Sequence, residues 1–119
     1  MNYETIIEVA QDPSNFGTIL DADVSSQDSN PLCGDSIRID AKIHEHKISE
    51  IKFSGQGCTV CMASASSLID SVKGKTLEES KLVDKDFILK KLDIESISSV
   101  RVKCAELSIN VFKSILEKI

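Results

Sequence analysis

The sequence predicts an α+β fold, in which a small three-stranded antiparallel sheet is covered by helices, with helices at the N-terminal and C-terminal ends. Three observations lead to this prediction. Residues 36–53 alternate apolar and polar side chains, residues 58–75 are rich in small side chains, and residues 100–119 repeat apolar side chains at mostly helical spacing. Extended segments followed by helical ones are typical of a sheet covered on one face. The chain of 119 residues is expected to form one domain, 1–119.

The N-terminal segment predicts a short helix. In NYETIIEVA (2–10) the apolar side chains recur at helical intervals, and the proline and glycine of QDPSNFG (11–17) then end the pattern.

Two strands joined by a tight turn are expected next. SIRIDAKIH (36–44) alternates apolar and charged side chains, and KISEIKFSG (47–55) repeats the pattern less strictly. HEHK (44–47) is polar and short enough to close a hairpin between them. A more weakly marked strand within DADVSSQDSN (21–30) completes a sheet of three.

The remainder of the chain is predicted to be helical. CTVCMASASSLIDSVKGK (58–75) places an apolar stripe among small residues, which favours a helix packed closely on the sheet. Thr76 and Glu79 form a capping-box pattern at the start of a further helix. KDFILKKL (85–92) is amphipathic, and the last twenty residues form the C-terminal helix.

Composition excludes several classes of function. The formal net charge of −5 argues against nucleic-acid binding, which needs clustered lysine and arginine to neutralise phosphates. No apolar run is long enough to span a membrane, and the N-terminus has neither the basic start nor the apolar core of a signal peptide. A cytoplasmic protein is therefore the expectation.

Four cysteines, at positions 33, 58, 61 and 104, are the most informative residues. In a secreted chain an even number would suggest two disulfides. In the reducing cytosol, thiols are more often used for metal, sulfur or redox chemistry. The second use is the expectation here, with the disulfide framework as the alternative.

Cys33, Cys58 and Cys104 each lie near a predicted element boundary, where side chains from separate elements can converge. Asp35 follows Cys33 by two residues on a strand, so both side chains are expected on one face and can share a metal. Three thiolates and one carboxylate make a four-ligand set. A cysteine taken alone is more often a small buried apolar residue.

Two features should hold these thiols in the reactive thiolate form. Cys58 lies at a predicted helix start, where unpaired amide groups and the helix dipole favour a negative charge. Arg101 and Lys103 are expected to act on Cys104 in the same direction.

The other candidate ligands have simpler explanations. Cys61 forms a C-x-x-C pair with Cys58, but a place in the core or behind the ligands is favoured over a redox or metal role. His44 and His46 lie in the predicted turn with polar neighbours, so exposed side chains are favoured over metal ligands.

These motifs together resemble the U-type iron–sulfur cluster assembly scaffolds, the family of IscU, SufU and the N-terminal domain of NifU. The matching pieces are NPLCGD (30–35), FSGQGCTVCMASASSLIDSVKGK (53–75) and RVKCAEL (101–107), in the family's order and at near-family spacing. The resemblance implies a SufE/NifU-like α+β domain with an exposed site for a nascent [2Fe-2S] cluster.

The resemblance also implies partners and roles. Sulfur would arrive as persulfide from a cysteine desulfurase, and the cluster would leave for apo iron–sulfur recipient proteins. A homodimer on cluster binding is compatible with this scheme. The implied ligands are Cys33, Cys58 and Cys104, with Asp35 as a labile fourth ligand, because a carboxylate binds iron more weakly than a thiolate. Cys104 is implied as the first acceptor of sulfane sulfur.

The chain also departs from the family pattern. Lys103 stands where IscU-type members carry histidine, as in the SufU branch, yet the SufU insertion after the helix ending at VKGK is lacking. SISSVRVK (96–103) replaces the LPPVK segment that engages an Hsp70 chaperone, so the resemblance gives no support for chaperone-driven release.

Two functions therefore stay open. The first is a scaffold that builds and hands on a [2Fe-2S] cluster. The second is a zinc-dependent, SufU-like sulfurtransferase, since Zn²⁺ readily accepts three thiolates and a carboxylate. Whether the protein is an enzyme depends on this choice. A purely structural zinc module is disfavoured, because such sites use closed sets of cysteines, or of cysteines with histidines.

Overall fold

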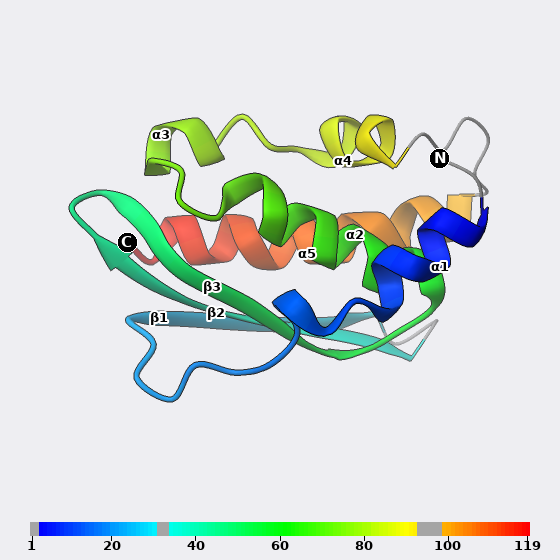
Figure 1. Cartoon of the computed structure of the whole chain (residues 1–119), viewed down its shortest axis with the longest axis horizontal. Helices are drawn as coiled ribbons and strands as arrows, with labels where there is room; N and C mark the ends of the chain where they lie inside the picture. Colours follow the sequence, from blue (N-terminus) through cyan, green and yellow to red (C-terminus); the bar gives the residue numbers. More distant parts are fainter. Residues whose placement is uncertain (1–2, 31–33, 93–98) are drawn as a thin grey trace.

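In the computed structural model the chain forms a three-stranded antiparallel sheet with its main helices on one face (Figure 1). The structure describes residues 3–30, 34–92 and 99–119, without the side chains of residues 3–5 and 99–102. The predicted α+β class and the helices at both ends are confirmed. None of the helices in these ranges has the length and apolar character that a membrane span requires.

The sheet is a meander of β1 (Val24–Asn30), β2 (Asp35–His44) and β3 (Lys47–Gln56). The register pairs Asn30 with Asp35 and Ser36 with Gln56, so the end of β1, the start of β2 and the end of β3 meet at one end of the sheet.

The opposite end of the sheet is closed by the predicted hairpin. Glu45 and His46 form its two-residue turn, and both have positive φ, at 50° and 64°. This is the conformation of the type I′ turn, whose twist matches that of paired strands.

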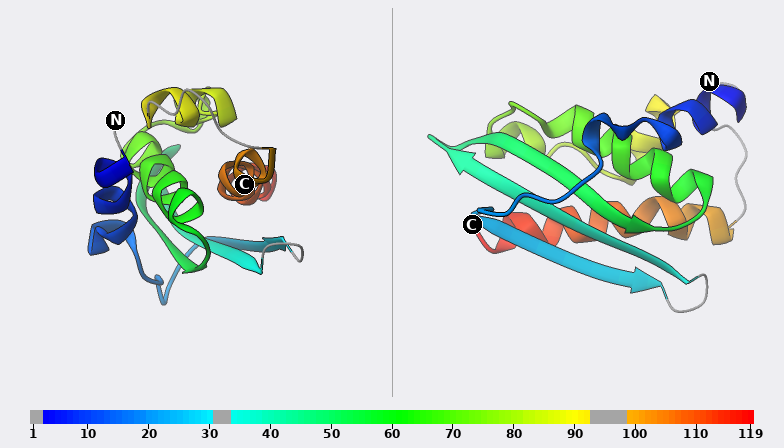
Figure 2. Two further views of the ribbon diagram at one scale, coloured as in Figure 1. Left: turned by 90° about the vertical axis from the view of Figure 1, so that its right-hand side faces the viewer. Right: turned by 60° about the horizontal axis from the view of Figure 1, so that its bottom comes forward.

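The helices form two layers above the sheet (Figures 1 and 2). The inner layer contains α2 and α5, with α1 beside α2, and α4 packs over α2 and α5 from outside. The bounds of the helices are α1 Tyr3–Gln11, η1 Pro13–Asn15, α2 Thr59–Val72, α3 Leu77–Ser80, α4 Lys85–Lys91 and α5 Ser99–Glu117.

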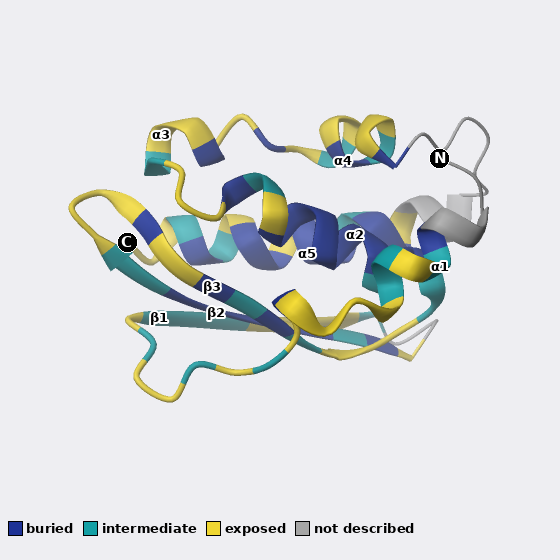
Figure 3. Ribbon diagram, viewed as in Figure 1, coloured by how far each residue is buried: buried dark blue, intermediate teal, exposed yellow. Residues whose placement is uncertain are grey.

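Helix α2 is the centre of the fold (Figure 3). The sequence predicts one apolar stripe along it, but nearly every position from Val60 to Ile69 is buried. The reason is that α2 packs against α1, α4, α5 and β3 at the same time. Its alanines and serines allow these close approaches, and α2 therefore holds its first residues in a fixed place relative to β2 and α5.

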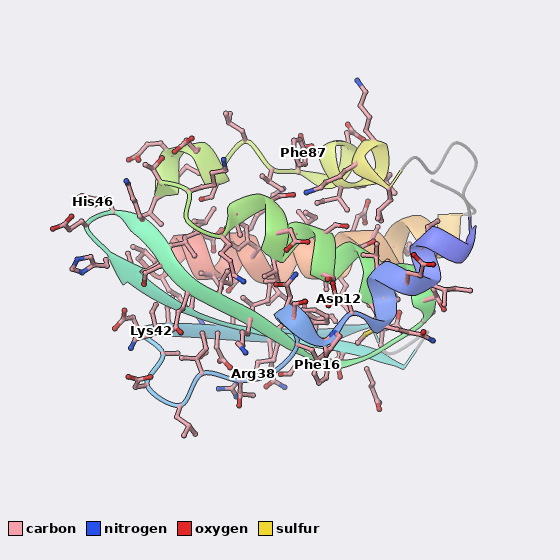
Figure 4. All side chains as sticks on the ribbon, in the orientation of Figure 1. Asp12, Phe16, Arg38, Lys42, His46 and Phe87 are labelled. Carbon is pink, nitrogen blue, oxygen red and sulfur yellow. The ribbon has the colours of Figure 1, made fainter. Side chains whose placement is uncertain are left out.

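The outer face of the sheet is partly covered by the segment between η1 and β1. Asp40 of β2 is buried there and accepts hydrogen bonds from the Ile19 amide, the Ser25 hydroxyl and the Arg38 guanidinium. The Arg38 side chain lies on this outer side of the sheet in Figure 4. A buried carboxylate is tolerated when it is paired in this way. Asp40 is therefore a satisfied structural residue.

Candidate metal centre

Three of the predicted ligands come together at the end of the molecule opposite the hairpin. Asp35 is the first residue of β2, Cys58 directly precedes α2, and Cys104 lies in the second turn of α5. One ligand atom from each, two thiol sulfurs and a carboxylate oxygen, lie within 4.8 Å of one another. Groups distant in sequence thus share one small volume.

Cys58 is placed by the start of α2. It is the N-cap residue of the helix, with extended backbone angles, and its Sγ accepts a hydrogen bond of 3.4 Å from the Cys61 amide. Sulfur is a weak acceptor compared with the oxygens that usually cap helices. The predicted position of Cys58 at the start of a helix is therefore confirmed. Cys58 is half-buried, so it can be reached from solvent.

Asp35 carries the clearest sign that the site is built for a further group. Its side chain is buried, with 4% exposure, and among the described residues Oδ2 has no hydrogen-bond partner. Leaving a buried acceptor unpaired costs about 1–3 kcal/mol, and more for a charged group. A cation between this oxygen and the two sulfurs would pair it. Two thiolates and a carboxylate are a donor set that suits zinc or iron.

Cys104 differs from its sequence-based expectation. It is buried, with 2% exposure. Burial, followed by hydrogen bonding and charge interaction with the Asp35 carboxyl and the Cys58 thiol, raises the pKa of the Cys104 thiol well above its usual range. The sequence predicted the opposite direction, because it placed Cys104 beside cations and at the head of the helix. A bound metal ion reverses this balance, since a coordinated thiol is deprotonated.

The two expected supporting cations are placed only in part. Lys103 is exposed and lines a groove of about 250 Å³ with Asn30 and Glu106. Among the described groups, Lys103 is not one of those that shift the pKa of the Cys104 thiol. The Arg101 side chain lies outside the described part of the chain.

Cys33 lies outside the described residues, two positions before Asp35 in the sequence. The place of Cys33 among the ligands therefore stays a prediction.

The remaining candidates lie where the simpler explanations placed them. Cys61 is fully buried in α2, behind Gly57. His44 and His46 are exposed at the hairpin, at the far end of the sheet from Asp35. Figure 4 labels His46 at the hairpin.

Sequence reasoning missed the part that Gly57 plays in the site. A β-carbon at this position would lie 2.8 Å from Cys61 Sγ and 3.2 Å from Asp35 Cγ. The sequence offers one signal, a glycine directly before the cysteine that begins a helix. This signal does not show which side chains pack against the glycine.

The structure is therefore that of a small α+β domain with a candidate metal site of two thiols and a carboxylate at one end. The model of the NifU-like N-terminal domain matches residues 1–118, and the chain belongs to this family.

Named relatives fall in both branches of the family. The chain is 30% identical over 113 residues to the iron–sulfur cluster assembly scaffold protein IscU 1 of Archaeoglobus fulgidus, covering 95% of this chain and 72% of the relative. It is 33% identical over 121 residues to the zinc-dependent sulfurtransferase SufU of Bacillus subtilis, covering 88% and 82%.

Solved structures agree with the fold. The crystal structure of FiSufU from Fervidobacterium islandicum AW-1 superposes with a TM-score of 0.84, covering 97% of this chain and 96% of that one. At 24% sequence identity this likeness concerns the fold alone.

Proposed function

We propose that this protein is an iron–sulfur cluster assembly scaffold. It accepts sulfur from a cysteine desulfurase, assembles a labile [2Fe-2S] cluster as its cargo and transfers the cluster to apo-proteins. Cys33, Asp35, Cys58 and Cys104 hold the cluster. Membership of the NifU-like N-terminal family and the IscU relatives support this function.

The observation that carries the proposal is the unpaired Asp35 oxygen beside two thiols. A carboxylate is a harder and weaker ligand for iron than a thiolate is. A site with one such ligand can hold a cluster while leaving one position easier to exchange. This property suits a protein that releases what it binds.

Sulfur transfer uses the thiols of the same site. The thiolate of Cys104 attacks the outer sulfur of the desulfurase persulfide, the sulfur–sulfur bond breaks, and the desulfurase cysteine leaves as a thiolate. The outer sulfur is then bound to Cys104 as a new persulfide. Because Cys104 is buried and its thiol pKa is raised, the reaction requires deprotonation and access, which a bound metal ion and the docked desulfurase would supply.

A zinc-dependent sulfurtransferase is the second candidate. The same thiols and Asp35 suit tetrahedral zinc, and the SufU relative from Bacillus subtilis carries that activity in its name. Bound zinc would lower the pKa of the coordinating thiols and so favour the thiolate form. In this function the site keeps its metal and hands on sulfur only.

One experiment separates the two functions. The protein is purified without oxygen and incubated with ferrous iron, cysteine, a reductant and a cysteine desulfurase. Sulfane sulfur needs electrons to become sulfide, and ferrous ions and the reductant supply them. A scaffold develops the charge-transfer absorption of a [2Fe-2S] cluster, with about two irons per cluster. A colourless protein that keeps zinc and accelerates the desulfurase would identify the sulfurtransferase instead.

A further inference from the structure

We propose that Gly57 is a positioning residue of the metal centre, because the absence of a side chain there lets Cys61 and Asp35 pack against the loop that carries Cys58. This inference rests on the proposed binding of metal by Asp35, Cys58 and Cys104. It concerns how the chain holds these ligands in place.

Gly57 lies in the short connection between β3 and α2, directly before Cys58. A β-carbon at this position would lie 2.8 Å from Cys61 Sγ, 3.0 Å from Cys61 Cβ and 3.2 Å from Asp35 Cγ. Non-bonded carbon atoms pack at roughly 3.5–4.0 Å. An added methyl group would therefore overlap with a residue behind the site and with one of its ligands.

The requirement at Gly57 is for space. Its backbone φ lies outside the left-handed region that favours glycine, in contrast to the φ of +131° at Gly55 and +76° at Gly74. The φ angle therefore places no left-handed strain on an alanine at position 57. The expected effect of the substitution comes from the contacts of the added methyl group.

The neighbours of Gly57 have little freedom to move away. Cys61 is fully buried within α2, which is packed on several sides, and Asp35 is buried at the start of β2. Close-packed interiors transmit such strain to adjacent groups. To relieve these contacts, Cys61, the Asp35 carboxylate or the loop bearing Cys58 must shift by a few tenths of an ångström, and the last two carry metal ligands. Metal ligands tolerate distance errors of only about 0.2 Å.

The test compares four proteins: wild type, Gly57→Ala, Gly57→Ala with Cys61→Ala, and Gly74→Ala. Zn²⁺ affinity is measured by competition with a chromophoric chelator, and the absorption spectrum of bound Co²⁺ reports the ligand geometry. Thermal unfolding without metal reports stability. Gly74→Ala is the matched control, because it imposes a positive φ on alanine in open space.

Gly57→Ala is expected to weaken Zn²⁺ binding by about ten- to a hundredfold, the usual effect of disturbing a residue that orients ligands, and to alter the Co²⁺ spectrum. Gly74→Ala should lower the unfolding temperature while leaving both metal readouts unchanged. Cys61→Ala in the Gly57→Ala background removes the sulfur that lies nearest the methyl group. Most of the lost affinity should then return.

Wild-type affinity and an unchanged Co²⁺ spectrum in Gly57→Ala would overturn the inference, as would a double variant that recovers nothing. If Gly57→Ala does not fold, the double variant decides. It must then fold and bind Zn²⁺ more tightly than a Cys58→Ser variant of this protein does. If the wild type binds neither Zn²⁺ nor Co²⁺, the proposed site fails and the inference fails with it.

Discussion

The two ends of the sheet differ in whether their polar groups have hydrogen-bond partners. At the hairpin end, the Ile48 amide donates to the Lys75 carbonyl, the Leu77 amide donates to the His46 carbonyl, and Thr76 and Glu79 form a complete capping box. At the other end, a buried carboxylate oxygen of Asp35 has no partner within the described ranges.

This difference shows what distinguishes a binding site from a set of suitable residue types. The hairpin end offers two histidines, which are common metal ligands, but both are exposed and their turn is held by backbone bonds. The other end converges Asp35, Cys58 and Cys104 from three separate elements. The candidate centre is defined by the convergence of these side chains and by the unpaired buried carboxylate oxygen, more than by the residue types alone.

The largest expected effect is a loss of metal binding when a cysteine of the candidate centre is replaced, with no such loss when a hairpin histidine is replaced. Cys58→Ser or Cys104→Ser should weaken Zn²⁺ binding by about a hundredfold or more, since each ligand carries a large share of a binding free energy of roughly 10–16 kcal/mol. His44→Ala and His46→Ala should bind Zn²⁺ as the wild type does. A histidine variant as defective as a cysteine variant would reverse the comparison between the two ends. Competition with a chromophoric chelator measures the Zn²⁺ affinity of all four variants.

Asp35→Ala tests the role of the unpaired carboxylate in two separate ways, through the lifetime of the cluster and through the stability of the protein without metal. The reconstituted cluster should persist several-fold longer in air and transfer more slowly to an acceptor, since the weak carboxylate ligand is gone. Without metal, the variant should be at least as stable as the wild type, because an unpaired buried oxygen has been removed.

The Asp35→Ala experiment has a matched control at the same end of the sheet, Asp28→Ala, which removes an exposed carboxylate. It should change neither the cluster lifetime nor the stability. Faster cluster loss in Asp35→Ala would mean that Asp35 retains the cluster.

The raised pKa of Cys104 predicts the pH dependence of the metal-free protein. At a pH near 8.5, the usual thiol pKa, Cys104 stays protonated in the folded state and ionises in the unfolded state. The folded state then binds more protons, so its stability should fall as the pH rises above about 8.5.

The reactivity of Cys104 should follow the same shift. Its alkylation, measured by mass spectrometry, should be slow at pH 8 and keep rising beyond pH 9, whereas the denatured protein should follow an ordinary thiol profile. An alkylation profile that levels off near the usual thiol pKa in the folded, metal-free protein would contradict this prediction.

A smaller effect is expected at the hairpin. His46 has a φ of 64°, a left-handed conformation that is costly for residues other than glycine. His46→Gly should therefore raise the free energy of unfolding by about 0.5 kcal/mol or more, after the larger unfolded-state entropy of glycine is subtracted.

His44→Gly is the control for this substitution, because His44 belongs to strand β2 and should lose stability with glycine. Urea unfolding compares the two variants. Equal destabilisation by both would contradict the assignment of strain to the turn.

The smallest functional effect is expected from Cys61→Ser. Cluster assembly should be retained within about twofold, because Cys61 lies behind the ligands and serine keeps nearly the same shape. Stability should fall by about 1–3 kcal/mol if the buried hydroxyl finds no partner. A loss of assembly as severe as that of Cys58→Ser, measured by the cluster absorption, would assign Cys61 a direct role.

Much of the fold could be predicted from local sequence. The alternation in residues 36–53 gave β2 and β3, and the Thr76–Glu79 pattern gave a capping box with both of its hydrogen bonds. The position of Cys58 at a helix start was also evident, because two glycines precede a run of small helix-compatible residues. These features depend on neighbours within a few positions along the chain.

The tertiary structure alone decided the chemistry of the candidate centre. The sequence placed Cys104 beside two cations, but in the fold burial and the groups from β2 and the start of α2 raise its pKa. The unpaired oxygen of Asp35, and the atoms that a β-carbon at Gly57 would meet, are likewise visible only in three dimensions. Desolvation and short-range contacts depend on distances between residues that are far apart in sequence, and packing sets those distances.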